Sequence, residues 1–419
     1  MSIVAVAKGE NTIDATKKAI QLLGGIQNFI KDGQTVFLKP DLSTPIGAPA
    51  STDPLVIGKI AKMCFAAGAK KVLVGDNPFG GISSKNLFKF TGLGEYLRNI
   101  GVTLINLENE HFERIKVSEP KVLKEIQLPK SVLSADVLIS IPTMRTDILS
   151  DVALSIKNLH GLLPDEQYFS LYKENLHEGL TDILKTIRPA LIIMDSFIGG
   201  EGQGPFNLSG VNIKFNLAST DSIAIDSIAA SIMGFDPIQI KHIKLAQDLN
   251  LYNGDPKKIS LLGDNPTYFN FKKAQLLPTD TEILGIHKGK CCSGCLASFR
   301  IFSDLIDTFL GKELQKYGGF TCLLGKNPEI SSYKRGIIVF GDCAILSSNN
   351  YAFNINKRIR RAYRIQEIPG CPPINLNIFE KIAINFKDKI PAFEFINEII
   401  KRWTKGRKLI VPRHTQIGA

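Results

Sequence analysis

The residues best suited to chemistry in this 419-residue chain are its cysteines, because six of the seven lie in the last third of the sequence. In a reducing cytosol such clustering favours metal ligation over disulfide bonds. Four thiolates are the usual ligand set of a 4Fe–4S cluster or of a structural zinc ion. The ligands that we expect are Cys292, Cys295, Cys343 and Cys371, with Cys291 able to replace Cys292.

The spacing of these cysteines favours an iron–sulfur cluster over zinc. Zinc ribbons and fingers usually pair two Cys-x2-Cys knuckles, whereas this chain has one such pair and two solitary cysteines. The segment Gly370–Pro373 reads Gly-Cys-Pro-Pro, which is similar to the Cys-Pro ending of cluster ligands in ferredoxins. Zinc and unligated thiols stay open as alternatives. Cys64 and Cys322 fall inside an expected helix and an expected strand, which indicates core residues.

Short apolar runs that alternate with helical segments must position these ligands and any substrate site. The clearest runs are 35–38, 71–74, 137–141 and 191–194. Strands that are apolar throughout and separated by helices are typical of mostly parallel sheets covered by helices. The sequence therefore predicts an α/β fold with a smaller C-terminal α/β unit that is rich in cysteine. The boundaries that we expect are 1–150 for an N-terminal lobe, 151–285 for a second lobe of the same family domain, 286–403 for the metal-binding unit and 404–419 for a flexible basic tail.

Polar residues follow three of these runs at the points where the strands end. They are Lys39, Asp76 and Arg145. Ligands of parallel sheets bind beyond the carboxyl ends of the strands, so these residues predict a binding site. The cationic groups favour an anionic substrate, a carboxylate or a phosphate. The further substrate-binding residues that we expect are Asn158, Asp195, Gly202, Gly204 and Asp221.

The glycine-dense stretch Gly199–Pro205 has two open interpretations. Its backbone N–H groups could hold a phosphate, or it could be a tight structural turn. Three other residues are candidates for catalysis: Lys157, His177 and Asp226. Asp226 lies on the apolar face of an expected helix, where a carboxylate needs a partner. Lys157 is the partner that we expect.

The net charge of +11 is concentrated at the end of the chain. From residue 351 onward there are 14 Lys/Arg and 5 Asp/Glu, and two clusters dominate, Lys357–Arg364 and Lys401–Lys408. These clusters are either a solvated surface with a frayed tail or the docking site of an acidic redox partner protein. The nearly neutral body argues against nucleic-acid binding. No apolar run reaches the roughly 20 residues of a membrane span and no signal peptide is recognisable, so we expect a cytoplasmic protein.

Several motifs together are similar to those of one family. They are Leu38–Asp41, Thr52–Pro54, Val74–Asp76, Ala135–Pro142, Ile156–Gly161, His177, Glu201–Pro205 and Asp221–Asp226. They resemble the family catalogued as domain of unknown function three-six-two, several branches of which are described as iron–sulfur centre proteins. The resemblance covers about residues 1–265, and the cysteine pattern looks like the tail of some members. Members often carry Lys and His where this chain has Arg145 and Asp147, so a titratable lysine and imidazole are not expected there.

Three functions fit these observations. The first is an oxidoreductase that contains a 4Fe–4S cluster and acts on an anionic small molecule. The second is an acid–base enzyme, such as an isomerase, in which the metal has only a structural role. The third is an electron-transfer or cluster-carrier protein without a substrate of its own. The sequence leaves the substrate, the electron partner and the oligomeric state open.

Overall fold

The computed structural model describes residues 2–44, 47–78, 83–173, 175–249, 259–276, 280–281, 283–350, 364–371 and 373. They form two compact units. Unit 1 contains the described residues up to Tyr168 and from Asn175 to Ala274, and unit 2 contains those from Phe169 to Lys173 and from Gln275 onward. The expected tail at 404–419 and the basic clusters, apart from Arg364, lie outside the described residues.

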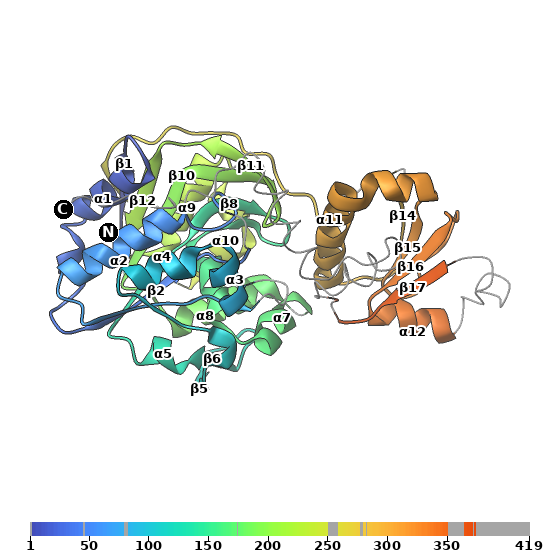
Figure 1. Ribbon diagram of the computed structural model, residues 1–419, viewed down its shortest axis with the longest axis horizontal. Coiled ribbons are helices and arrows are strands. Elements are labelled where there is room, and N and C mark those ends of the chain that lie inside the picture. The colour runs from blue at the N-terminus through green and yellow to red at the C-terminus, as the bar shows by residue number, and fades with distance from the viewer. Residues whose placement is uncertain are drawn as a thin grey trace. The chain divides into compact units, whose positions relative to one another are not determined.

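Unit 1 is built on an 11-stranded sheet whose main path has the strand order β13-β1-β12-β10-β7-β2-β3-β4 (Figure 1). Strands β10, β7, β2, β3 and β4 are mutually parallel, whereas β12 runs antiparallel to both of its neighbours. The prediction of a mostly parallel α/β sheet is confirmed. The strands are β1 (Ile3–Lys8), β2 (Thr35–Pro40), β3 (Lys71–Val74), β4 (Thr103–Leu104), β7 (Val137–Ile141), β8 (Thr143–Asp147), β9 (Asp151–Ala153), β10 (Leu191–Gln203), β11 (Asn207–Asn212), β12 (Phe215–Ser219) and β13 (Ser260–Gly263).

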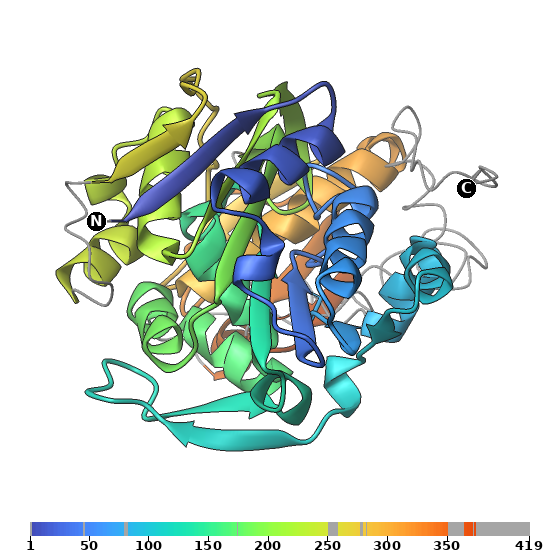
Figure 2. The same ribbon diagram turned by 90° about the vertical axis from the view of Figure 1, so that its left-hand side faces the viewer.

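Helices cover this sheet in two layers, which are visible on either side of it in Figure 2. One layer contains α1 and α2, which pack on each other, and the other contains α6, α8, α9 and α10. The first layer forms because apolar residues of α2, such as Ile57 and Ile60, pack on Leu38 and Ile139 of the sheet. The helices are α1 (Thr12–Leu22), α2 (Pro54–Ala66), α3 (Ser84–Phe90), α4 (Leu93–Asn99), α5 (Lys130–Leu133), α6 (Ser155–Asn158), α7 (Asp165–Lys173), α8 (Leu176–Thr186), α9 (Ser222–Ile232) and α10 (Lys241–Asp248).

The glycine-dense stretch is not a loop. Residues 199–203 continue strand β10 and pair antiparallel with β11. Gly202 and Gly204 therefore belong to a hairpin, and Gly204 sits there because a Cβ would lie 2.0 Å from the carbonyl oxygen of Thr146. The backbone pairing favours the structural interpretation of this stretch, and phosphate binding by its N–H groups stays a prediction.

A separate antiparallel hairpin, β5 (Phe112–Lys116) and β6 (Glu125–Pro129), projects beside the sheet (Figure 2). Its loop is tied to α8 by the buried carboxylate of Asp182. That carboxylate accepts the backbone N–H groups of Lys121, Val122 and Leu123 at 2.8 to 3.1 Å. The short strands of this hairpin alternate apolar and polar or charged residues, so no apolar run in the sequence predicts them.

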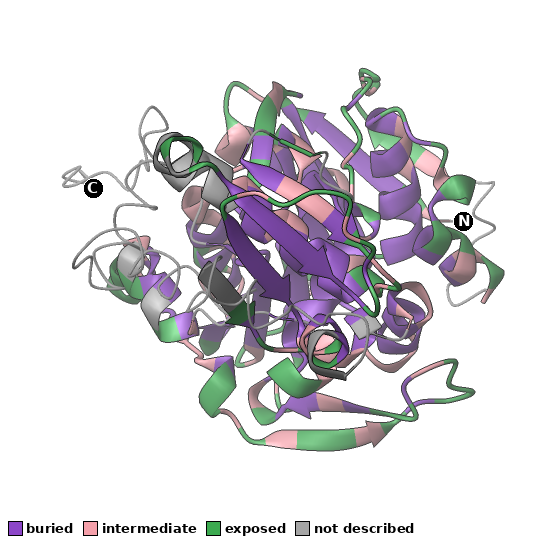
Figure 3. Ribbon diagram, turned by 90° about the vertical axis from the view of Figure 1, so that its right-hand side faces the viewer, coloured by how far each residue is buried: buried purple, intermediate pink, exposed green. Residues whose placement is uncertain are grey.

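Unit 2 contains a four-stranded, wholly parallel sheet of β14 (Leu284–Lys288), β15 (Phe320–Leu324), β16 (Gly336–Phe340) and β17 (Arg364–Ile368), in that order. Strands β15 and β16 are buried throughout (Figure 3). Helix α11 (Ser293–Tyr317) contributes Phe299 and Phe302, whose rings pack on Phe340 with centroids 5.2 and 5.3 Å away. Helix α12 (Asp342–Asn350) contributes Ala344, which packs on Val339.

Candidate functional site

A small polar cavity lies in unit 1 beyond the carboxyl ends of β2, β3 and β7. Its volume is about 30 Å³, which is room for about two water molecules. The charged and titratable groups around it are Lys39, Asp41, Asp76, Arg145, Lys157, His160 and Tyr168. Lys39, Asp76 and Arg145, which we expected to meet because each follows a strand end, all line this cavity. Lys157 and Asn158 of α6 line it as well.

Lys39 and Asp76 form the innermost ion pair of this cavity. Their Nζ and Oδ1 atoms are 2.7 Å apart, and each side chain is 2% exposed. Lys39 also donates to the side-chain oxygen of Asn158 at 2.6 Å and to the carbonyl oxygen of Pro40 at 3.0 Å. Burial raises the pKa of Asp76 to about 6, although the Lys39 ammonium opposes this. Asp76 is thus a carboxyl that can change its protonation state near neutral pH.

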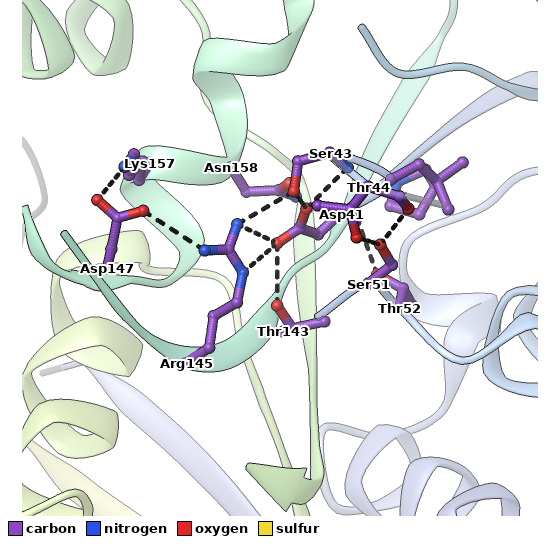
Figure 4. A network of polar contacts seen from close by, with 12 residues as sticks. Asp41, Ser43, Thr44, Ser51, Thr52, Thr143, Arg145, Asp147, Lys157 and Asn158 are labelled. Carbon is purple, nitrogen blue, oxygen red and sulfur yellow. Dashed lines mark hydrogen bonds and ion pairs between the residues drawn. The ribbon is translucent and has the colours of Figure 1, made fainter. Parts of the chain in front are cut away.

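The outer part of the cavity is a chain of alternating charges (Figure 4). Arg145 donates through Nε and Nη2 to one oxygen of Asp41, at 3.1 and 3.0 Å, and its Nη1 lies 3.5 Å from Asp147. Asp147 also accepts from the ammonium of Lys157. Burial disfavours both charged carboxylates, but Arg145 with Lys39 lowers the pKa of Asp41, and Lys157 with Arg145 lowers that of Asp147. Both carboxylates are therefore ionised, and each cation of the cavity has a carboxylate partner.

His160 adds a neutral imidazole to the same cavity. Its ring stacks on that of Tyr168, with centroids 3.8 Å apart, and its Nε2 lies 3.0 Å from the carbonyl oxygen of Tyr168. Since a carbonyl only accepts, Nε2 carries the proton and Nδ1 has a lone pair. Burial, reinforced by Lys157, lowers the pKa of His160 to about 3. The ring is therefore neutral, and only a weak base, at neutral pH.

Asp41 and His160 line the cavity, and Asp147 contacts two lining residues, but sequence reasoning selected none of the three. Asp41 is two residues beyond Lys39, and Asp147 is two residues beyond Arg145. Side chains two apart along a strand point to the same face, so Asp147 lies on the same face of β8 as Arg145 and contacts both Arg145 and Lys157. That alternation is the signal that could have identified Asp147.

Gly161 packs directly against the ion pair of Lys39 and Asp76, which leaves no room for a Cβ atom. A Cβ there would lie 2.2 Å from Asp76 Oδ1 and 2.9 Å from Lys39 Nζ. Gly161→Ala should therefore separate the pair and lower the free energy of unfolding by about 1–3 kcal/mol, as overpacking does. Urea denaturation checks this, with Gly210→Ala as the control, because a Cβ there meets only a methyl group of Ile198 at 3.1 Å. Equal stability of the two variants would contradict the prediction.

Asp226 does not pair with Lys157. Its two oxygens accept the backbone N–H groups of Ser155 and Ile156 at 2.8 and 2.9 Å, so it caps the N-terminus of α6 from a different helix. Burial raises the pKa of Asp226 to about 8, against those two hydrogen bonds. Asp226 faces no substrate in this arrangement. It holds the helix that carries Lys157, so the expected partnership with Lys157 is wrong.

Other expected substrate-binding residues lie away from the cavity. Asp221 is the N-cap of α9, where it accepts from the N–H groups of Ile223 and Ala224. Asp195 accepts from the backbone N–H of Asp53 at 2.8 Å. Burial and the nearby Asp53 carboxylate raise the pKa of Asp195 to about 7. Neither residue lines the cavity, nor do Gly202 and Gly204.

His177 also lies outside the cavity lining, beside a histidine that the sequence did not single out. The rings of His177 and His242 are stacked with centroids 5.7 Å apart. His242 is fully buried, and neither of its ring nitrogens has a hydrogen-bond partner among the described residues. Burial lowers its pKa to about 3, and the charges of His177 and Lys157 act in the same direction.

This pKa makes His242 a source of acid instability. The unfolded chain binds the proton near pH 6.5 and the folded chain near pH 3, so His242 costs stability as the pH falls below about 6.5. His242→Leu should gain about 1.4 kcal/mol relative to wild type for each pH unit below about 6.5. Urea denaturation at two pH values measures the gain, and the same change at the exposed His111 is the control. A pH-independent difference at His242 would refute the assignment.

In unit 2, five cysteines gather at the carboxyl edge of the sheet. Cys291 and Cys292 follow β14, Cys343 follows β16 and begins α12, and Cys371 follows β17. Cys295 joins them from the first turn of α11. Because all four strands are parallel, these segments meet at one edge.

The thiols interact in two groups. Cys295 hydrogen-bonds with Cys291 and Cys292, and the bond with Cys291 is the largest cause that raises the pKa of Cys295 to about 12. Cys343 hydrogen-bonds with Cys371. The Cys295 sulfur also lies beside Gly341, since a Cβ atom added to that glycine would be 3.4 Å from the sulfur. In the described residues no group of three or more Cys, His, Asp or Glu converges to hold a single metal ion.

The loops that carry these thiols are fastened to one another. The N–H of Gly341 donates to Ile368 O at 2.8 Å, and that of Asp342 to Gly370 O at 3.1 Å. The carboxylate of Asp342 accepts the N–H of Gly370 at 2.7 Å. On the other side, Lys290 and Lys326 exchange two backbone hydrogen bonds of 2.9 and 2.7 Å. Backbone contacts thus fix the positions of the cysteine loops.

Comparison with known proteins identifies relatives of unit 1. The family model for the domain of unknown function DUF362 matches residues 36–231. The thylakoid-associated protein sll1697 of Synechocystis sp. is 27% identical over 240 residues, which cover 55% of this chain and 73% of that protein. No helix in the described part of the chain is long and apolar enough to cross a membrane.

Two solved structures share a general likeness with the chain. The lactate racemase apoprotein from Thermoanaerobacterium thermosaccharolyticum is 12% identical with a TM-score of 0.40, and the match covers 96% of this chain and 90% of that one. A Thermotoga maritima protein is 10% identical with a TM-score of 0.36, and the match covers 57% of this chain and 60% of that one. Likeness at this level carries no inference about the reaction.

Proposed function

Residues 36–231 belong to the DUF362 family, and we propose that the chain is an oxidoreductase whose unit 2 binds a 4Fe–4S cluster while the cavity of unit 1 binds an anionic small molecule. The observation that carries this proposal is the gathering of cysteines at one edge of the unit 2 sheet. The ligands that we assign to the cluster are Cys292, Cys295, Cys343 and Cys371, with Cys291 beside them as a substitute for Cys292.

The spacing of the cysteines along the chain, one Cys-x2-Cys pair and two solitary cysteines, favours a cluster over a zinc ion. Zinc needs all four sulfurs about 2.3 Å from one point. A cubane cluster instead binds each thiolate at a different iron, so its ligands are spread further apart. Cys292 hydrogen-bonds with Cys295 and Cys343 with Cys371, so these thiols would separate on binding four different irons. When bound, such a cluster supplies one-electron transfer.

The charge balance of the cavity shapes how an anion would bind there. Lys39, Arg145 and Lys157 are each paired with a carboxylate, so an anion must replace one of those partners. Asp76 is the carboxyl most easily neutralised, since its pKa is raised to about 6. Its protonation would release Lys39 to a carboxylate or phosphate of the substrate. We therefore expect anion binding to strengthen as the pH falls through about 6.

One observation favours a second candidate, a non-redox acid–base enzyme. The cavity holds a neutral imidazole, His160, and a titratable carboxyl, Asp76, within unit 1 alone. Proton transfer between such groups needs no cluster. In this case the metal would only stabilise unit 2.

Anaerobic purification followed by metal analysis and electron paramagnetic resonance tests the main proposal. About four irons and four sulfides per chain are expected, with one electron taken up from dithionite per cluster. A colourless protein with one bound zinc would sink the proposal. The second candidate predicts that cluster-free protein still exchanges a carbon-bound hydrogen of a small carboxylate with deuterium, which NMR can follow. The oxidoreductase proposal predicts that the loss of the cluster ends turnover.

A further inference from the structure

Helix α10 is short, and its contact with α8 has a polar centre. The helix has eight residues and buries three of its side chains, one of which is His242. The His242 ring stacks on that of His177 from α8, with the ring centroids 5.7 Å apart. Beside the rings, Lys241 of α10 pairs with Glu178 of α8 at 2.9 Å. Two imidazoles are therefore a large part of what packs α10 on α8.

The hydrogen-bonding capacity of these rings is largely unused. Both ring nitrogens of His242 and the Nδ1 of His177 are buried without a hydrogen-bond partner among the described residues. A buried ring in this state must stay neutral, because a buried charge needs a partner. Burial accordingly lowers the pKa of His242 to about 3 and that of His177 to about 4. In water the same rings would be protonated below about pH 6.5.

The charges nearest to the rings belong to ion pairs. The carboxylates of Asp147 and Glu178 are paired with the ammonium groups of Lys157 and Lys241. The carboxylates favour a protonated His177 and the two lysines disfavour it. On His242, Lys157 disfavours the proton and Asp147 favours it, and the neighbouring ring of His177 adds to the unfavourable side. Since attraction and repulsion oppose each other, burial dominates.

The remaining acids on the packed elements are engaged with backbone N–H groups. Besides α8, the elements packed on α10 include α9 and η4 (Pro237–Gln239). Asp226 of α9 accepts from the start of α6, and Asp236 before η4 accepts from Ile238 at 3.2 Å. Asp182 of α8 accepts from the loop of the β5–β6 hairpin. These acids are therefore directed at other parts of the chain.

We infer that the stacked rings of His177 and His242 are a pH-sensitive latch that releases α10 from α8 in acid. A protonated ring does not fit the buried position, so each ring takes up its proton as α10 moves away, and the proton then opposes the return of the helix. Two like charges would also repel each other. Because the charges of Lys157 and Asp147 act on both rings, the latch lies beside the outer part of the cavity. This inference depends neither on the cluster nor on an anion in the cavity.

Hydrogen exchange with mass spectrometry tests the latch on the intact chain. Exchange of the α10 amides, corrected for the intrinsic rate of a free peptide, gives the opening constant of the helix. Each histidine that is neutral when buried and protonated when exposed raises this constant about tenfold per pH unit. Between about pH 6 and pH 4 the opening constant of α10 should therefore rise at least ~10-fold per unit, and about 100-fold if both rings take up a proton. Peptides of β7, which is buried throughout, report the unfolding of unit 1 as a whole.

The comparison of α10 with β7 on wild-type protein decides whether the opening is local. At pH 4.5 the opening constant of α10 should exceed that of β7 at least ~10-fold, because α10 leaves while the sheet stays folded. Equal constants would mean that α10 opens only when the whole unit unfolds, and would overturn the inference. In His242→Leu the opening constant of α10 should rise about tenfold less per pH unit than in wild type, whereas His111→Leu, at an exposed position, should behave as wild type. An unaltered pH dependence in His242→Leu would equally reject the latch.

Discussion

Cys371→Ser should yield protein without the absorbance near ~400 nm of a cysteine-ligated cluster and with little bound iron. The physical reason is that Cys371 has no substitute nearby. Cys343, its hydrogen-bond partner, is already assigned as a ligand, and the spare thiol of Cys291 lies in the other group, against Cys295. Anaerobic absorbance and iron analysis of purified wild type and variant provide the measurement.

Because five cysteines lie at this edge, variants at different cysteines should lose different amounts of iron. Cys292→Ser should retain much of the iron, because Cys291 can take its place, whereas the double change at Cys291 and Cys292 should lose it. Cys322→Ala is the control, since Cys322 is buried within β15 and away from the ligand edge. If Cys371→Ser kept full iron and colour, the assigned ligand set would be wrong.

Asp41→Ala should lower the free energy of unfolding by about 3–5 kcal/mol, which is the usual cost of removing one partner from a buried ion pair. The variant leaves the Arg145 guanidinium with Asp147 as its remaining carboxylate, at 3.5 Å, and Asp147 is shared with Lys157. It also removes the acceptor of Thr143 Oγ1 and Ser43 Oγ. Urea denaturation followed by circular dichroism measures the loss.

A surface pair provides the matched control for this experiment. Lys18 and Asp14 are 2.7 Å apart on α1, with the Lys18 side chain 51% exposed, so Lys18→Ala should change stability far less than Asp41→Ala. Asp41→Asn should fall between the two, because the amide keeps an acceptor oxygen but loses the charge. Equal effects of Asp41→Ala and Lys18→Ala would mean that the cavity network does not stabilise unit 1.

Local sequence signals predicted the strands well where apolar runs are short and bounded. The runs 71–74 and 137–141 match β3 and β7 residue for residue. Asp53 caps α2 as its position before Pro54 suggests, by accepting the N–H of Leu55. The glycine content of residues 199–204 indicated a loop or a turn, but residues 199–203 form a strand. Cross-strand pairing with β11 overrides the local tendency of glycine to form loops.

The site was harder to predict than the fold, because partners far apart in sequence decide it. Strand ends correctly brought Lys39, Asp76 and Arg145 to one cavity. The partner of Lys157 is Asp147, ten residues away, and the partner of Asp226 is backbone rather than a side chain. No periodicity in the sequence indicates that a helix end will be capped from another helix.

The fastened loops of unit 2 have a consequence for the order of assembly. In zinc fingers the metal must arrive before the chain can fold, so metal affinity and folding are one equilibrium. Here Gly341, Asp342 and Gly370 already hold the segments of Cys343 and Cys371 together through backbone hydrogen bonds. Most of the entropy of loop closure is therefore lost during folding of the polypeptide. A metal centre that binds after folding would therefore bind to a preformed site. Its loss would leave a folded protein that can bind a new metal centre.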